Sequence, residues 1–244
     1  RSMMMLNAML AEQLIEFKNE VDSLIASGVK KDEALFQVIR KLIIESRPIH
    51  FDGNGYSEEW HEEAQRRGLT NITSVPESID KFLSEQAKKV LVSTGILTKR
   101  ELEARHEVEM EKFVKKVQIE ARVMGDLVIN HIVPTAIAYQ NMLISNVKGM
   151  HDVLGNEANT YTESEKQLIR QVSEHVMAIR SGVQQLIEAR KKANYIEDMT
   201  QRAYAYHETV LPVMTEIRFH VDELEMIVDN EMWPLPKYRE LLFS

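Results

Sequence analysis

The sequence predicts an all-α protein built as a bundle of long helices, and three observations support this fold class. Only 9 glycines and 6 prolines occur among 244 residues, which leaves few positions for the frequent turns of an all-β fold. Apolar residues recur at steps of three and four, the period of one helix face, and no period-two strand pattern stands out. Capping boxes at residues 74–77, 98–101 and 162–165 mark helix starts.

The first two helices are expected at about residues 3–26 and 32–45. Each carries one apolar stripe: Leu6, Leu10, Leu14, Phe17, Val21 and Leu24 in the first, and Leu35, Val38, Ile39, Leu42 and Ile43 in the second. Gly28 suits the end of the first helix. A loop follows at residues 47–56, where Asp52-Gly53 and Asn54-Gly55 are consecutive turn dipeptides.

Two further helices are expected before residue 97. Ser57 is expected to cap a short helix that Gly68 ends. The capping box at residues 74–77 then opens a helix that continues up to Gly95.

The second half of the chain is predicted to contain the longest helices. One starts at residue 98 and is expected to kink at Pro134, before a loop at residues 149–160. The next starts at residue 162. The last covers about residues 196–227, is expected to kink at Pro212, and has a heptad pattern.

The last two long helices should therefore pack as an antiparallel hairpin, with Val183 and Ile217 buried between them. The tail is expected to dock because its aromatic residues need burial: Trp233, Tyr238 and Phe243.

Composition excludes several classes of function. The chain has no cysteine, which excludes disulfides, cysteine-ligated metals and thiol catalysis. A net charge of −8 and a pI of about 5.6 argue against a nucleic-acid partner. No signal peptide is visible, and no uninterrupted apolar run approaches the roughly 18 residues of a membrane span. We therefore expect a cytoplasmic protein without a membrane partner, and, because the chain starts at Arg1 rather than Met, a piece of a longer polypeptide.

Few residues suggest chemistry. Glu58/His61 and Glu103/His106 have the Glu-x-x-His spacing of di-metal carboxylate proteins. The first pair lies on a short helix and not on a long bundle helix, and the second lies in a charged stretch, so we interpret both as ordinary exposed surface. His220 occupies a heptad core position, where a hydrogen-bonded core or interface histidine is the favoured interpretation over a catalytic one.

Other features of the sequence assign no site. His131 could bond a carbonyl freed at Pro134. The Gly53-Asn54-Gly55 loop lacks the third glycine of a dinucleotide fingerprint, so a connecting turn is favoured over an active-site or interface loop. We assign no catalytic, cofactor-binding or metal-binding residue.

Several longer motifs resemble one enzyme family. Residues 49–69 (IHFDGNGYSEEWHEEAQRRGL) and 232–243 (MWPLPKYRELLF) resemble segments in the C-terminal part of type III glutamine synthetases. Residues 132–140 (IVPTAIAYQ) are similar to a third family segment. Residues 101–108 (ELEARHEV) are similar to a fourth, with Ala104 and His106 where the family has Ser and Tyr.

The resemblance implies an enzyme that joins ammonia to glutamate with ATP and Mg or Mn ions. It places the catalytic residues in a β-rich barrel that precedes this region, so it implies no cofactor and no site residue here. Residues 1–97 would pack against that barrel, and residues 98–244 would form a long-helix bundle with a docked tail.

The resemblance also implies the partners of this region. They are the rest of the same polypeptide and other subunits of a homo-oligomer, whose multi-ring assembly the region helps to build and whose active sites are shared between subunits. Two alternatives remain at this stage: a free-standing helical adaptor, and a di-metal carboxylate enzyme. A gene that encodes a barrel in frame upstream of this region would support the synthetase, and a stop codon just before Met3 would support the free-standing adaptor.

Overall fold

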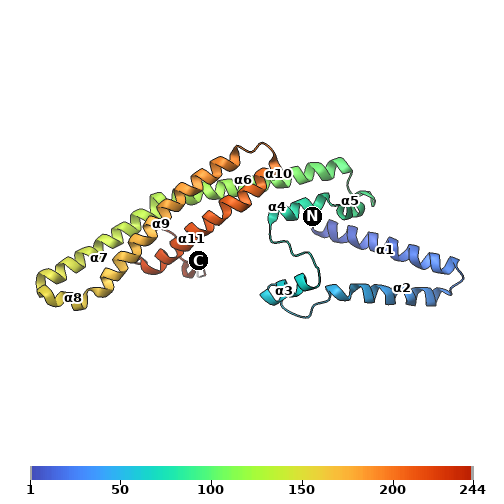
Figure 1. The fold of residues 1–244 in the computed structure, drawn as a ribbon, viewed down its shortest axis with the longest axis horizontal. Helices are drawn as coiled ribbons and strands as arrows, with labels where there is room; N and C mark the ends of the chain where they lie inside the picture. Colours follow the sequence, from blue (N-terminus) through green and yellow to red (C-terminus); the bar gives the residue numbers. More distant parts are fainter. Residues whose placement is uncertain (1, 243–244) are drawn as a thin grey trace. The chain divides into compact units, whose positions relative to one another are not determined.

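The computed structural model describes residues 2–242, and no strand occurs in that range (Figure 1). The predicted all-α fold is confirmed. The chain forms two compact units, Arg1–Glu109 and Met110–Ser244. Their division falls inside a helix that starts at Lys99, whereas the sequence suggests a boundary just before that helix.

The first unit consists of short and medium helices. They are α1 (Ser2–Ala26), α2 (Lys31–Ser46), α3 (Glu58–Arg66), α4 (Val75–Asp80), α5 (Glu85–Val92) and the start of α6 (Lys99–Leu127), with 3-10 turns at Arg47–Ile49 and Lys81–Leu83. Helices α1 and α2 form a hairpin around Val21, Ala34 and Val38 (Figure 1). Gly28 ends α1 with a φ of 95°, a left-handed conformation that favours glycine.

The prediction of one continuous helix from residue 75 to residue 95 is wrong, because the structure has two helices there, α4 and α5. Ser84 adopts an extended backbone, with φ −63° and ψ 154°, and its Oγ accepts a hydrogen bond from the Ala87 amide. The chain therefore starts a new helix, α5, because serine competes for backbone groups and favours caps. The capping box at residues 98–101 forms as predicted, with Thr98 N 2.8 Å from Glu101 Oε2 and Glu101 N 3.2 Å from Thr98 Oγ1.

The second unit holds the longest elements. The rest of α6 is followed by a π-helical turn (Val128–Ile132), α7 (Val133–Leu154), a 3-10 turn (Gly155–Glu157), α8 (Ala158–Tyr161), α9 (Glu163–Asn194), α10 (Met199–Ala205), a second π-helical turn (Tyr206–Val210), α11 (Leu211–Ile227) and α12 (Tyr238–Leu241). Each π-helical turn ends two residues before a proline, Pro134 or Pro212, and the helix resumes beyond it. A widened turn accommodates the hydrogen bond that proline cannot make.

Helices α9 and α11 form the predicted hairpin core. Val183 is 7% exposed and Ile217 is 1% exposed, which confirms both as buried seam residues. The two helices approach closely at Gly182, where a Cβ atom would lie only 2.8 Å from Ile217 Cγ1. At the C-terminal end of α9, the hydroxyl of the buried Tyr206 donates to Asn194 Oδ1 at 2.8 Å.

Two predictions between α7 and α9 are wrong. The expected loop at residues 149–160 is mostly helical, and the chain turns at Gly155, whose φ is 59°. The expected capping box at residues 162–165 does not form. Thr162 is buried and its Oγ1 donates to the Ala158 carbonyl at 2.8 Å, so the hydroxyl does not cap α9.

The tail docks through Trp233, which is 8% exposed. Lys237 Nζ lies 5.8 Å from the centre of its ring and donates to the Glu225 carbonyl at 2.7 Å. The side chain of Tyr238 and all of Phe243 lie outside the described residues.

The helical stretch Lys99–Tyr161 is long and apolar enough, by length and composition, to cross a membrane, with a mean hydropathy of 1.2 in its most apolar window. Asn130 and Gln140 interrupt this stretch, so it contains no uninterrupted apolar run of the length of a membrane span. Helix α7 packs against α9, but only 22% of this window is buried in the structure.

Candidate functional site

The loop before α3 is the most elaborate local structure in the first unit. Its backbone is held by Arg67, whose Nη1 donates to the His50 carbonyl at 2.6 Å and to the Pro48 carbonyl at 3.2 Å. Helix α3 places Arg67 at its C-terminal end, and Gly68 then reverses the chain with a φ of 71°. The loop is thus tied to the far end of the helix that follows it.

Aromatic packing fixes the base of the same loop. The rings of Phe51 and Trp60 lie 4.6 Å apart between centroids, tilted by 37°. The Arg67 guanidinium carbon lies 6.0 Å from the centre of the Phe51 ring. Gly53 approaches this ring so closely that a Cβ atom would lie 2.4 Å from Phe51 Cζ, so a larger residue would displace it.

The tip of the loop is a built turn that presents a tyrosine. Asn54 Oδ1 accepts from the Tyr56 amide at 3.0 Å, and Ser57 Oγ donates to the Asn54 carbonyl at 2.9 Å. Ser57 precedes α3 as predicted, but its hydroxyl serves this turn and does not cap the helix. Tyr56 is 95% exposed. A rigid base with an exposed aromatic tip suits recognition of another surface.

Electrostatics strengthen the anchor. Glu63 accepts hydrogen bonds from Arg66 and Arg67, and these two bonds lower the pKa of its carboxyl to about 2. Glu63 therefore stays ionised at any ordinary pH and keeps Arg67 oriented toward the loop.

Members of the two Glu-x-x-His pairs contact side chains outside the pairs. His61 pairs with the Asn71 side chain, and Glu103 lies 3.8 Å from Lys99. Among the residues that the structure describes, no group of three or more His, Asp or Glu side chains could hold a metal ion.

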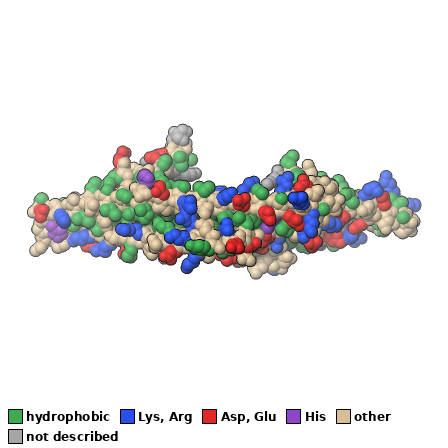
Figure 2. Space-filling model, turned by 90° about the horizontal axis from the view of Figure 1, so that it is seen from above, with side chains coloured by type: hydrophobic (Ala, Val, Ile, Leu, Met, Phe, Trp, Pro, Cys, Tyr) green, Lys and Arg blue, Asp and Glu red, His purple; other side chains and the backbone are tan. Residues whose placement is uncertain are grey.

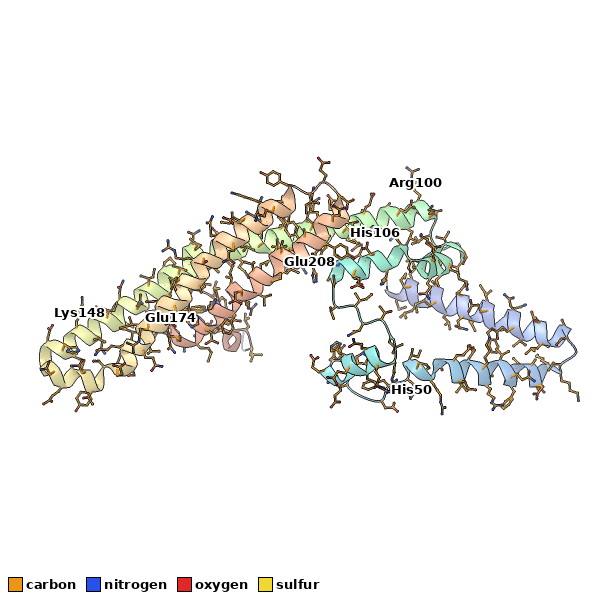
Figure 3. The ribbon with its side chains drawn as sticks, viewed as in Figure 1. His50, Arg100, His106, Lys148, Glu174 and Glu208 are labelled. Atoms are coloured by element: carbon orange, nitrogen blue, oxygen red, sulfur yellow. The ribbon has the colours of Figure 1, made fainter. Side chains whose placement is uncertain are left out.

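His106 corrects one interpretation. We expected it on exposed surface, but it is 8% exposed and its Nε2 lies 2.7 Å from Asp80 Oδ1 (Figure 3). No local pattern indicates this pair, because 26 positions of the chain separate its members. Beside it lies an apolar cavity of about 240 Å³, lined mainly by Met4, Met5, Ile79, Phe82, Leu91, Leu97 and Leu102.

The other two histidines singled out from sequence lie in the second unit. His220 is half-buried and pairs with His175 across the α9–α11 seam, as expected for a hydrogen-bonded core residue. His131 is exposed on the π-helical turn before Pro134.

The fold is a helical region in which Arg67 and the Phe51–Trp60 ring contact hold the loop at residues 47–57, the anchored loop. Comparison with known proteins identifies its family. A family model described as the glutamine synthetase C-terminal domain matches residues 34–151, which include the anchored loop and α6. The chain is 50% identical over its whole length to a glutamine synthetase of Bacteroides fragilis (strain YCH46), and 32% identical over 98% of its length to a type-3 glutamine synthetase of Dictyostelium discoideum.

A glutamine synthetase of Butyrivibrio fibrisolvens is 27% identical over 98% of the chain. The chain belongs to the glutamine synthetase family and corresponds to its C-terminal region, which confirms the resemblance seen in the motifs. It spans about a third of each relative, namely 34%, 32% and 34% of their lengths.

Proposed function

We propose that this chain is the structural, assembly-forming C-terminal part of an enzyme that joins ammonia to glutamate with ATP and Mg or Mn ions, and that it is inactive alone. The relatives are named glutamine synthetases and are about three times longer than this chain. The catalytic residues would lie in the part that the chain does not cover. Its partners would be that part and further subunits.

The observation that carries this proposal is an apolar stripe on α1 that the described residues leave exposed. Leu6, Leu10 and Leu14 are 62%, 59% and 57% exposed. The same helix buries Val21 against α2, so its stripe is used at one end and open at the other. Exposed apolar area costs roughly 25 cal/mol per Å², and a contiguous stripe marks a surface that another structure covers.

Helix α2 continues this pattern. Ile39 and Ile43 lie on its predicted apolar stripe and are 47% and 61% exposed. We assign the rest of the same polypeptide as the structure that covers the exposed residues of both helices. The relatives are about three times longer than this chain, so each of their molecules contains such a further segment.

The second unit exposes apolar residues as well. Met142 and Val153 on α7 are 51% and 81% exposed. On the face seen in Figure 2, apolar side chains lie among interspersed positive and negative ones, an arrangement suited to protein contacts. We assign this surface to contacts with other subunits.

The direct test uses the 244-residue chain in calorimetry with Mg-ATP and in a glutamine-formation assay. We expect neither tight ATP binding nor turnover, because ATP phosphates need a metal ion, converging backbone amides or clustered positive side chains. Micromolar ATP binding, or glutamine formation above that of a heat-denatured control, would show that the chain itself holds an active site.

A further inference from the structure

We propose that His175 and His220 form a binding site for a single divalent transition-metal ion of the Zn²⁺ class, held between α9 and α11. The site lies within the second unit, is separate from the anchored loop, and does not depend on the proposed function. Imidazole nitrogen is a preferred ligand of zinc, nickel and copper ions.

The spacing of the two rings carries the proposal. The Nδ1 atoms of His175 and His220 lie 3.0 Å apart, with ring centroids 5.2 Å apart and planes at 56°. With metal–nitrogen bonds of about 2.0–2.1 Å, two imidazole ligands lie roughly 2.9 Å apart at a right angle and roughly 3.3 Å apart in a tetrahedron. The observed separation falls between these values. One ion can therefore replace the proton that the two nitrogens share.

The surroundings of His220 fix the nitrogen that would bind. Its Nε2 lies 3.3 Å from Glu216 Oε1, one helical turn earlier on α11. A carboxylate at this position favours the tautomer with the proton on Nε2, which leaves the lone pair of Nδ1 directed at His175. The same carboxylate–histidine arrangement orients ligands in established metal sites. Only 18% of the His220 side chain is exposed, and the Phe219 ring lies 5.2 Å from it.

Charge around the pair suits a cation. Burial and the neighbouring His220 lower the pKa of His175. Glu223 on α11 and Glu174 on α9 place negative charge near the pair; Figure 3 shows Glu174. Since no third ligand from the described residues completes the set, water molecules would fill the remaining positions.

The test is zinc titration of the 244-residue chain by calorimetry, with thermal unfolding followed by circular dichroism. We expect one Zn²⁺ per chain at micromolar concentration and a higher Tm with zinc. His175→Gln and His220→Gln should each weaken binding by about tenfold or more, in line with the loss of one of two ligands. His151→Gln, a change to a histidine on α7, is the matched control and should bind zinc like the original chain. Binding only at millimolar zinc, or equal affinity in all variants, would overturn the proposal.

A second measurement does not rely on stability. With Cu²⁺ as the probe, electron paramagnetic resonance should show coupling to two imidazole nitrogens in the original chain, and to one in either variant of the pair. A spectrum without coupling to two nitrogens in the original chain would show that the pair is only a hydrogen bond across the seam.

Discussion

Ile217 and Gly182 together set how closely α9 and α11 approach. Ile217 is 1% exposed, so Ile217→Ala would leave a cavity in a seam that cannot collapse around Gly182 without moving a helix. We expect a loss of about 2–5 kcal/mol in the free energy of unfolding, measured by denaturant titration. The exposed control Glu188→Ala should stay within about 0.5 kcal/mol. Equal losses at both positions would mean that the seam is not the core of the hairpin.

Glu63 gives the first unit a defined response to acid. Its pKa is lowered to about 2, so the stability it contributes is fully present above its unfolded value of 4.5 and is lost as the pH falls toward 2. We expect Glu63→Gln to lower Tm at pH 7 and to flatten the decline of Tm between pH 4.5 and 2. Glu59→Gln, on the same helix, serves as the control. A Glu63→Gln variant with an unchanged acid profile would contradict the anchoring role of this carboxylate.

Single residues differ in how far sequence could place them. Val183 and Ile217 follow from heptad spacing alone, because their burial depends on local periodicity. His106 and Arg67 do not. His106 depends on Asp80 from another helix, and Arg67 reaches carbonyls 17 and 19 positions earlier in the chain. Periodicity carries no information about such contacts.

At the level of elements, α1 makes the most specific prediction. Its outer leucines are exposed in this chain, and we infer that they are covered in the whole protein. The triple change Leu6→Gln, Leu10→Gln and Leu14→Gln should therefore leave the Tm of the 244-residue chain within a few degrees and raise its solubility. The same change in a full-length enzyme should lower its Tm, since it would bury three amides in an apolar contact.

Val38→Gln is the contrasting change for that experiment. Val38 is 2% exposed between α1 and α2, so this variant should be destabilised in the short chain and in the full-length enzyme alike. If the triple variant were equally unstable in the short chain, the exposed stripe would already be part of its core.

The limits of helices were predictable where side chains decide them locally. The start of α6 follows from the reciprocal bonds of Thr98 and Glu101, and the end of α1 from Gly28. The break at Ser84 and the single turn at Gly155 were missed. The Thr162 motif failed as a cap because tertiary packing buries its hydroxyl against Ala158. Where burial competes with a local motif, sequence pattern alone selects the wrong outcome.

At the scale of the whole molecule, we propose a different role for each unit: the first contacts the rest of the polypeptide, and the second contacts other subunits. The first exposes its apolar stripe and its anchored loop, and the second exposes apolar residues along α7. The family could be identified from motifs because long, specific stretches at residues 49–69 and 232–243 survive in order. The role of each exposed surface could not be predicted from the sequence, because it depends on other chain segments and subunits whose positions a single sequence does not give.

Removing the second unit together with the start of α6 provides the last prediction. In a full-length enzyme that contains this chain, deletion from residue 98 onward should yield a particle with fewer subunits, counted by dividing the mass from light scattering by the mass of the shortened subunit. We expect activity per subunit to fall with it, because the resemblance to type III glutamine synthetases implies active sites shared between subunits, which would be lost when the subunits separate. Glu188→Ala in the full-length enzyme is the control and should retain both size and activity. A deletion variant that keeps the original number of subunits would contradict the assembly role. One that keeps that number and loses activity would assign this region to the chemistry itself.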